Sequence, residues 1–309
     1  MAEIVLVHGI AQEQKSADTL EKEWLPDLAG GVRTAGGAGL ADALWRSARP
    51  GRLESRMAFY GDVFLQKGAQ GAAEDPAELT ETQRELTDAL ALEWLRNARD
   101  RAPEPGDRRI ARTVLHDIEG GDEGRQGRRS AGRAAVNGLA RLKWFSRLGM
   151  GFAQRFVNKS LVQVTRYMTE PSVYEEVQQR IADLIGPETR ILVGHSLGSV
   201  AAYEAALRLE GELPLLLTLG SPLGLRTLVH DRLEGEHQVP ELVGRWVNLA
   251  DKDDVIAAEP DLAKRFADPR GVLESDWTLD NGEDDPHSAQ AYLTKRQTGQ
   301  AVRETLEPR

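Results

Sequence analysis

Three short segments of the chain are apolar at nearly every position, residues 3–7, 190–193 and 213–219, and residues 244–250 form a further expected strand. A strand covered by helices on both faces has this continuous pattern, because neither of its faces meets water. Two further segments, residues 57–64 and 271–279, combine aromatic and β-branched residues with turn-forming residues at their ends. We therefore expect six strands, of which the apolar ones lie inside a parallel sheet.

Between these segments, apolar residues recur at the spacing of amphipathic helices. In residues 16–28, Leu20, Trp24 and Leu28 share one helical face, and the helix is expected to end near Pro26. Residues 30–39 are rich in glycine and are expected to form a loop. Strands that alternate with helices predict a doubly wound α/β fold with a mostly parallel sheet. Further helices are expected at residues 40–48, 173–185, 199–207 and 288–300.

The segment of about residues 66–160 interrupts this alternation. A long helix is expected at residues 74–101. Residues 102–133 are rich in glycine, proline and charge and, apart from a periodic stretch at residues 110–118, predict an irregular connection. Residues 139–157 then form a basic amphipathic segment. We therefore expect one domain over residues 1–309, with a helical cap or lid insertion over about residues 66–160.

Charge is distributed unevenly along the chain. The net charge of −10 argues against general nucleic-acid binding, yet residues 124–159 hold nine Arg or Lys and no Asp or Glu. The basic segment at residues 139–157 could make a peripheral contact with an anionic membrane. It could equally be a cap helix with a solvated basic face, which Gly149 and Gly151 favour because glycine interrupts a helical pattern.

The chain has no cysteine, which excludes disulfides and thiolate chemistry. Its first residues lack a basic segment followed by a long apolar one, so no signal peptide is expected. No apolar run reaches the roughly 18 residues of a membrane-spanning helix. A cytoplasmic protein is the expectation.

The motif Gly194-His195-Ser196-Leu197-Gly198 follows a predicted strand and opens a predicted helix. In that context the pattern is typical of a nucleophile elbow, in which a serine projects from a sharp turn. The glycines allow the strand and the helix to approach each other, and the helix N-terminus directs free N–H groups toward an oxyanion. Ser196 is therefore the candidate nucleophile.

A serine nucleophile needs a base and a group that orients the base. In this architecture the chain order is serine, acid, histidine, and of six histidines only His287 follows both the serine and a strand-end carboxylate. His195 lies inside the motif, and its side chain is expected to point away from Ser196. His287 is therefore the candidate base.

The acid is less firmly assigned, because Asp251, Asp253 and Asp254 all follow one strand within a turn. Asp254 precedes the apolar residues Val255-Ile256-Ala257, which would dock its loop, and this favours Asp254. Asp251 is the main alternative, and Asp253 also stays open. The acid would fix the imidazole tautomer and stabilise the imidazolium.

These motifs occur together in the order found in a known superfamily. They are Val7-His8-Gly9-Ile10, the Ser196 motif, Gly220-Ser221-Pro222 and His287. The chain resembles the α/β-hydrolase superfamily, in particular bacterial serine esterases and lipases, over roughly residues 1–65 and 170–309. The resemblance implies an α/β-hydrolase fold, oxyanion-hole donors at the N–H groups of Leu197 and Ile10, and no metal or organic cofactor.

The function expected from these features is hydrolysis of carboxylic esters, with a small-molecule or lipid ester as substrate and an acyl-enzyme on Ser196. Two alternatives stay open. One is a hydrolase-fold binding module without activity, and the other is a membrane-surface phospholipase or thioesterase that uses the same triad.

Overall fold

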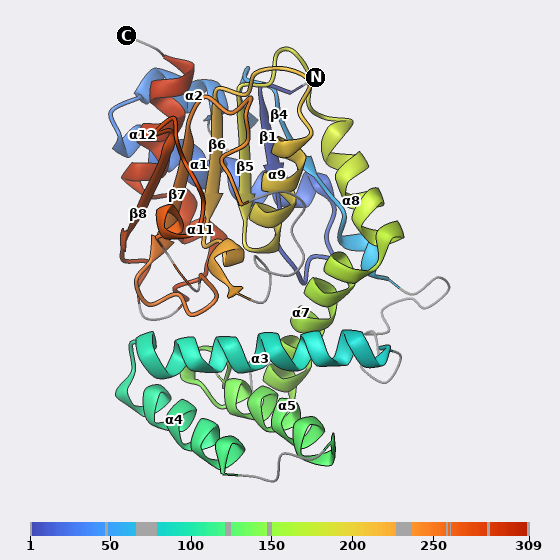
Figure 1. The fold of residues 1–309 in the computed structure, drawn as a ribbon. Helices are drawn as coiled ribbons and strands as arrows, with labels where there is room; N and C mark the ends of the chain where they lie inside the picture. The colour runs from blue at the N-terminus through green and yellow to red at the C-terminus, as the bar shows by residue number, and fades with distance from the viewer. Residues whose placement is uncertain are drawn as a thin grey trace.

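The centre of the protein is a parallel sheet of six strands in the order β4-β1-β5-β6-β7-β8. The computed structural model describes residues 2–46, 49–65, 79–120, 125–146, 150–226, 237–257, 259, 261–282 and 285–307. The strands are β1 (Ile4–Val7), β4 (Ser55–Ala58), β5 (Ile191–His195), β6 (Leu215–Leu219), β7 (Trp246–Asp251) and β8 (Leu273–Leu279). The predicted α/β class and parallel sheet are confirmed (Figure 1).

Strand β1 lies at the point where the strand order changes direction. Its Val7 pairs with Ala58 of β4 on one side and with Gly194 of β5 on the other. The chain adds β4 on one side of β1 and then builds outward from β5 on the opposite side. In open parallel sheets a crevice forms at the carboxyl ends of the strands at such a switch point, and ligands bind there.

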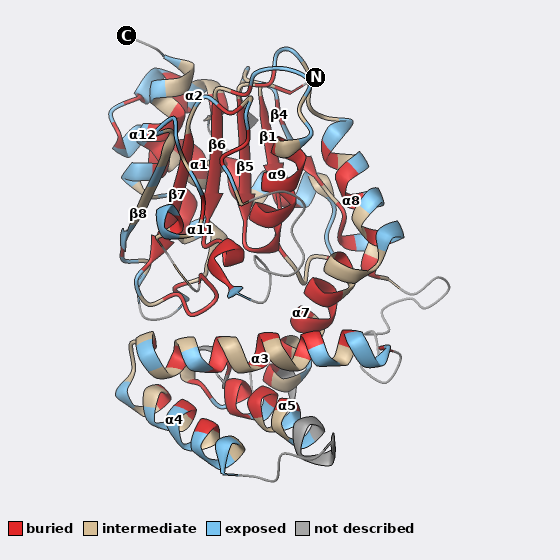
Figure 2. Ribbon diagram, in the orientation of Figure 1, coloured by how far each residue is buried: buried red, intermediate tan, exposed pale blue. Residues whose placement is uncertain are grey.

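Helices cover both faces of the sheet, and Figure 2 shows that β1, β5, β6 and β7 are buried, whereas most of the edge strand β8 is not. One face packs against α1 (Ala17–Thr34), α2 (Ala38–Leu44), α11 (Ala289–Leu293) and α12 (Arg296–Leu306). The other packs against α8 (Pro171–Ala182) and α9 (Leu197–Leu207). In β1, Ile4 and Leu6 join one apolar core while Val5 and Val7 join the other. This double burial explains the continuous apolar runs of the sequence.

Helix α1 does not end near Pro26, and most of the loop predicted for residues 30–39 is helical. The helix runs through Pro26 to Thr34, and α2 begins at Ala38. Packing against the end of the chain accounts for this, because a Cβ at Gly31 would lie 2.4 Å from the Leu293 carbonyl oxygen. The glycine therefore marks a close contact inside the fold and does not end the helix.

Among the described residues, five helices precede α8 in the stretch between β4 and β5. They are α3 (Glu81–Arg101), α4 (Pro105–Glu119), α5 (Arg125–Ala140), α6 (Lys143–Ser146) and α7 (Met150–Thr169), and together we call them the helical region. The irregular connection predicted for residues 102–133 is wrong, since α4 and α5 cover most of it. Their buried side chains include the small Ala111 and Ala135, which give little periodic signal. Residues 66–78, the start of the predicted insertion, lie outside the described residues.

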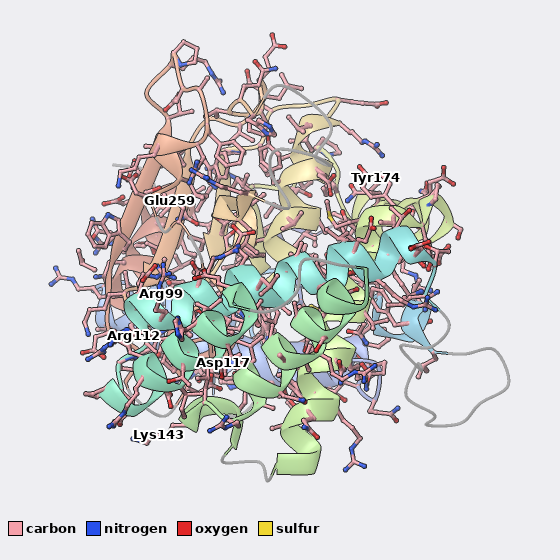
Figure 3. The ribbon with its side chains drawn as sticks, turned by 60° about the horizontal axis from the view of Figure 1, so that its bottom comes forward. Arg99, Arg112, Asp117, Lys143, Tyr174 and Glu259 are labelled. Carbon is pink, nitrogen blue, oxygen red and sulfur yellow. The ribbon has the colours of Figure 1, made fainter. Side chains whose placement is uncertain are left out.

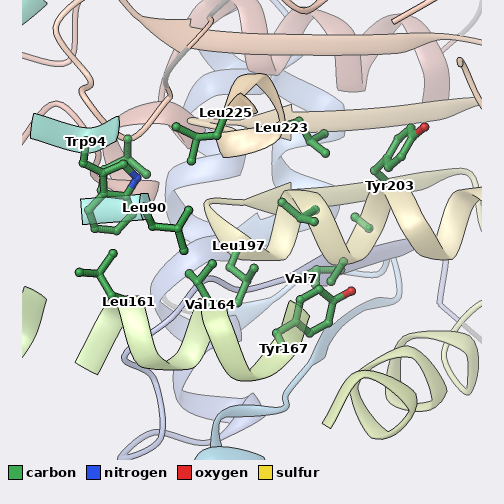
Figure 4. Close-up of a cluster of buried hydrophobic side chains, with 14 of the residues drawn as sticks. Val7, Leu90, Trp94, Leu161, Val164, Tyr167, Leu197, Tyr203, Leu223 and Leu225 are labelled. Carbon is green, nitrogen blue, oxygen red and sulfur yellow. The ribbon is translucent and has the colours of Figure 1, made fainter. Parts of the chain in front are cut away.

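The helical region lies beyond the carboxyl ends of the strands (Figure 1). In Figure 4, Leu90 and Trp94 of α3 and Leu161 and Val164 of α7 gather near Leu197, the first residue of α9, within one buried cluster. The segment at residues 139–157 is divided among α5, α6 and α7, and Leu139, Leu142, Phe145 and Val157 are buried. Its described apolar side chains therefore face the interior.

The remaining elements are short. The predicted helix at residues 288–300 is two helices, because the chain turns between α11 and α12. A small antiparallel pair joins β2 (Trp45–Arg46) to β3 (Arg49–Pro50). Short 3-10 turns are η1 (Gly61–Phe64), η3 (Pro222–Gly224) and η4 (Leu262–Lys264). Within the described residues, no helix combines the length and apolar character needed to cross a bilayer.

Candidate active site

Ser196 occupies a strained turn between β5 and α9. Its φ of 55° and ψ of −131° lie outside the regions that L-residues usually adopt, and it is buried. A Cβ at Gly194 would lie 2.5 Å from the Gly198 carbonyl oxygen, and a Cβ at Gly198 would lie 2.3 Å from that of Val7. The two glycines of the motif are therefore required by packing. Backbone strain of this kind is commonly kept at functional sites.

The turn that follows β1 lies beside Ser196. A Cβ placed on Gly9 would lie 2.8 Å from the Cβ of Ser196 and 3.3 Å from its Oγ. Ala11 holds a φ of 60°, and its N–H donates to Oε1 of Gln163 over 2.8 Å. Gln163 belongs to α7 and is buried, so the helical region holds this turn in place.

His8 fixes the start of the same turn as a neutral imidazole. Its Nδ1–H donates to the Gly9 carbonyl over 2.6 Å, while its Nε2 accepts from the Tyr60 N–H over 3.0 Å. The Tyr60 hydroxyl donates to the His8 carbonyl. Burial lowers the pKa of His8 to about 4, which agrees with a neutral ring. His8 thus links β1 to the segment after β4.

Asp254 and His287 form a buried pair at the carboxyl edge of the sheet. His287 Nδ1 lies 2.7 Å from Asp254 Oδ2, and the Asp254 side chain is fully buried. The Tyr292 hydroxyl donates to the same oxygen over 2.9 Å. Oδ1 accepts from the N–H groups of Ile256 and Ala257 over 2.9 and 3.3 Å. The carboxylate is therefore held from both sides.

These contacts set the charge of the pair. Burial alone would raise the pKa of Asp254, but His287 and the hydrogen bonds from Tyr292 and Ile256 outweigh it and leave the pKa lowered. Burial lowers the pKa of His287, whereas the carboxylate of Asp254 raises it above the ordinary 6.5. Asp254 is therefore ionised at neutral pH, and it favours a proton on His287 Nδ1.

The other two aspartates have different partners. Oδ1 of the buried Asp251 accepts from the Asp253 N–H over 2.7 Å, and Oδ2 accepts from the Asn281 N–H. Asp253 pairs with Lys252 at 2.8 Å. Asp251 therefore joins the loop after β7 to the loop after β8, and Asp254 alone among the three contacts the His287 ring.

The His195 side chain, which was expected to point away from Ser196, lies against His287. Its Nε2–H donates to the carbonyl of His287 over 2.8 Å, and the two rings are 4.7 Å apart. Burial, reinforced by His287, lowers the pKa of His195 to about 3, so the imidazole is neutral. His195 supports the loop that carries His287.

Ser196 and His287 line one cavity of about 220 Å³. The helical region contributes Trp94, Phe145 and Phe156 to its wall, and the turn after β1 contributes Gly9 and Ile10. A larger hollow of about 1110 Å³ lies between α8 and the loop after α9, and it is lined by none of these residues. The smaller cavity therefore combines apolar surface with the candidate nucleophile and the candidate base.

Leu197 and Ile10, the residues expected to supply oxyanion-hole donors, both lie next to residues of the candidate site. Leu197 is the first residue of α9, where helix geometry leaves the backbone N–H without an intrahelical acceptor. Ile10 follows Gly9 in the adjacent turn and lines the cavity.

Among the described residues, no group of three or more His, Asp or Glu side chains is arranged to hold a metal ion.

Three residues at the site carry no motif in the sequence: Tyr292, Gln163 and Arg101. Tyr292 and Gln163 make the contacts given above, and the Arg101 guanidinium donates to the Asp254 carbonyl over 2.6 Å. The sequence gives only a weak indication for Tyr292, which lies in the helix predicted at residues 288–300, directly after His287.

The chain matches no protein-family model, no curated protein and no solved structure.

Proposed function

We propose that this protein is a serine hydrolase of carboxylic esters with an α/β-hydrolase fold, in which the helical region forms a cap over the site. The observation that carries the proposal is a cavity lined by both Ser196 and His287, in which the serine is held at positive φ on a strand-to-helix turn and the histidine ring pairs with the buried Asp254. A base oriented by a carboxylate beside a serine is the arrangement that activates a hydroxyl group.

In the proposed reaction, Ser196 Oγ attacks the ester carbonyl carbon while His287 Nε2 takes the hydroxyl proton. The tetrahedral oxyanion accepts hydrogen bonds from the N–H groups of Leu197 and Ile10. His287 then gives its proton to the leaving alcohol, and an acyl-enzyme remains on Ser196. Water attacks this ester with His287 again as base, which releases the carboxylic acid and restores the serine.

The size of the cavity supports a small acyl group. At about 220 Å³ it lies below the roughly 300–1,000 Å³ of sites for drug-sized ligands. It exceeds the roughly 150 Å³ of a protein cavity known to hold benzene. Aromatic side chains of the helical region supply apolar surface, so we expect acetyl to hexanoyl esters to be cleaved faster than long-chain esters.

Hydrolysis of a series of nitrophenyl esters tests the proposal. Purified wild-type protein should cleave the short esters, and Ser196→Ala should lower kcat by about 10⁴-fold or more while the thermal unfolding curve keeps its cooperativity. Wild-type protein without turnover on any ester of the series would favour a binding module. Equal rates for wild-type protein and Ser196→Ala would show that another group performs the chemistry.

A further inference from the structure

Helix α3 of the helical region contacts the loop that carries Asp254. The Arg101 Nη2 group donates to the carbonyl oxygens of Asp254 and Ala257 over 2.6 and 2.8 Å. One turn earlier, Asn97 Nδ2 donates to the Val255 carbonyl over 3.2 Å. Two side chains from one helix therefore bind three carbonyl groups within four consecutive residues of this loop.

The two carbonyl groups bound by Arg101 belong to the turn that holds the carboxylate. The side chain of Asp254 accepts from the N–H groups of Ile256 and Ala257, so residues 254–257 form a closed turn around Oδ1. Arg101 binds the first and last carbonyl groups of this turn from outside. A shift of Arg101 would therefore move the turn and the direction in which Oδ2 faces His287.

The same face of α3 reaches the cavity. Trp94, Asn97 and Arg101 follow one another at spacings of three and four residues, which places them on one side of the helix. Trp94 lines the cavity that contains Ser196. One rigid element thus connects the cavity wall to the Asp254 loop.

The stability of the fold alone does not explain why an arginine is buried at position 101. Its Nε and Nη1 atoms are buried and have no hydrogen-bond partner among the described residues. Buried charged groups with unpaired donors cost free energy, and an apolar side chain of similar size is often tolerated as well or better. An apolar side chain at this position would satisfy packing but could not bind the two carbonyl groups.

We propose that Arg101 is a positioning residue, which holds the Asp254 turn and thereby makes the orientation of His287 depend on the docking of helix α3. The inference rests on the proposed function, because it concerns the same triad. It adds that the helical region, besides covering the cavity, completes the triad from outside the sheet.

Arg101→Met and Arg101→Lys test this role, with Arg99→Met as the matched control. Arg99 lies on the same helix near its end and pairs with the adjacent Asp100 (Figure 3). Arg101→Met should lower kcat by about 10- to 100-fold with little change in KM, since a misplacement of about 1 Å can cost about 100-fold. Arg101→Lys keeps the charge and should retain more activity, and Arg99→Met should match wild-type protein.

The NMR titration of His287 separates positioning from a simple effect of charge. Asp254, Asp285 and the His195 ring surround His287, while Asp253, Asp254, Glu259 and Tyr292 lie near Arg101. If Arg101 positions Asp254, Arg101→Met weakens the contact that raises the pKa of His287, and this pKa falls. If Arg101 acts only as a nearby cation, its removal raises the pKa of His287.

The results that would overturn the role of Arg101 differ from those that would overturn the proposed ester hydrolysis. A wild-type kcat for Arg101→Met, or a pKa of His287 that is unchanged or raised, would overturn the positioning role. The titration needs no turnover, so it decides the role of Arg101 even if the wild-type protein cleaves no ester. Thermal unfolding of each variant identifies a loss of folding, in which case Arg101→Lys carries the test.

Discussion

Gly220, which follows β6, lies close to both members of the buried Asp254–His287 pair. Its φ is +53°, and a Cβ there would lie 2.9 Å from Asp254 Oδ2, 2.9 Å from Tyr292 Cε2 and 3.2 Å from His287 Nδ1. In Gly220→Ala the left-handed backbone costs about 1–2 kcal/mol. Pushing held neighbours aside adds about 1–3 kcal/mol. The sum stays below the stability of most domains, about 5–15 kcal/mol, so the variant should fold.

Gly271→Ala isolates the backbone contribution. Gly271 has a φ of +66°, and a Cβ there would meet no atom within 4 Å. Chemical denaturation should therefore show Gly220→Ala to be about 1–3 kcal/mol less stable than Gly271→Ala. Ester hydrolysis by Gly220→Ala should fall by about 10- to 100-fold in kcat, since the triad geometry is displaced. Equal stability and equal activity of the two variants would refute the packing argument.

Two further predictions concern the groups around Asp254. Tyr292→Phe removes a donor to Asp254 and leaves the buried Asp251 N–H without its acceptor. The free energy of unfolding, measured by chemical denaturation, should therefore fall by about 1–3 kcal/mol. An unchanged denaturation midpoint would contradict this. Activity should rise with pH through the pKa of His287, which Asp254 raises above 6.5, because the base must be neutral. Asp254→Asn should move this rise in activity to lower pH and reduce kcat by about 10⁴-fold. If the rise stayed at the same pH, Asp254 would not be the partner of the base.

The sheet could be predicted from sequence because local pattern and tertiary burial agree there. Strands β1, β5, β6 and β7 have apolar side chains on both faces, and the structure covers both faces with helices. The exceptions depend on contacts between distant segments. Helix α1 continues past Pro26 because the end of the chain packs closely against it at Gly31. No local signal reports that contact.

In the candidate site, too, some residues could be predicted from local sequence, and others depend on contacts between distant segments. The positions of Ser196 and His287 followed from a short motif and from chain order, since both depend on the ends of consecutive strands. Arg101 lies 153 residues from Asp254 along the chain, and their contact exists only because α3 packs against the loop after β7. Helix α5 was missed for a related reason, because small buried residues such as Ala135 contribute to its packed face.

Covalent labelling tests the central claim, that Ser196 is an activated nucleophile, most directly. Wild-type protein and Ser196→Ala would be incubated with a fluorophosphonate, and the adduct would be located by intact mass and peptide mapping. If Ser196 is the activated nucleophile, the wild-type protein should carry one adduct, on the peptide that contains Ser196, and Ser196→Ala should carry none. No adduct on folded wild-type protein, or an adduct on another residue, would contradict it.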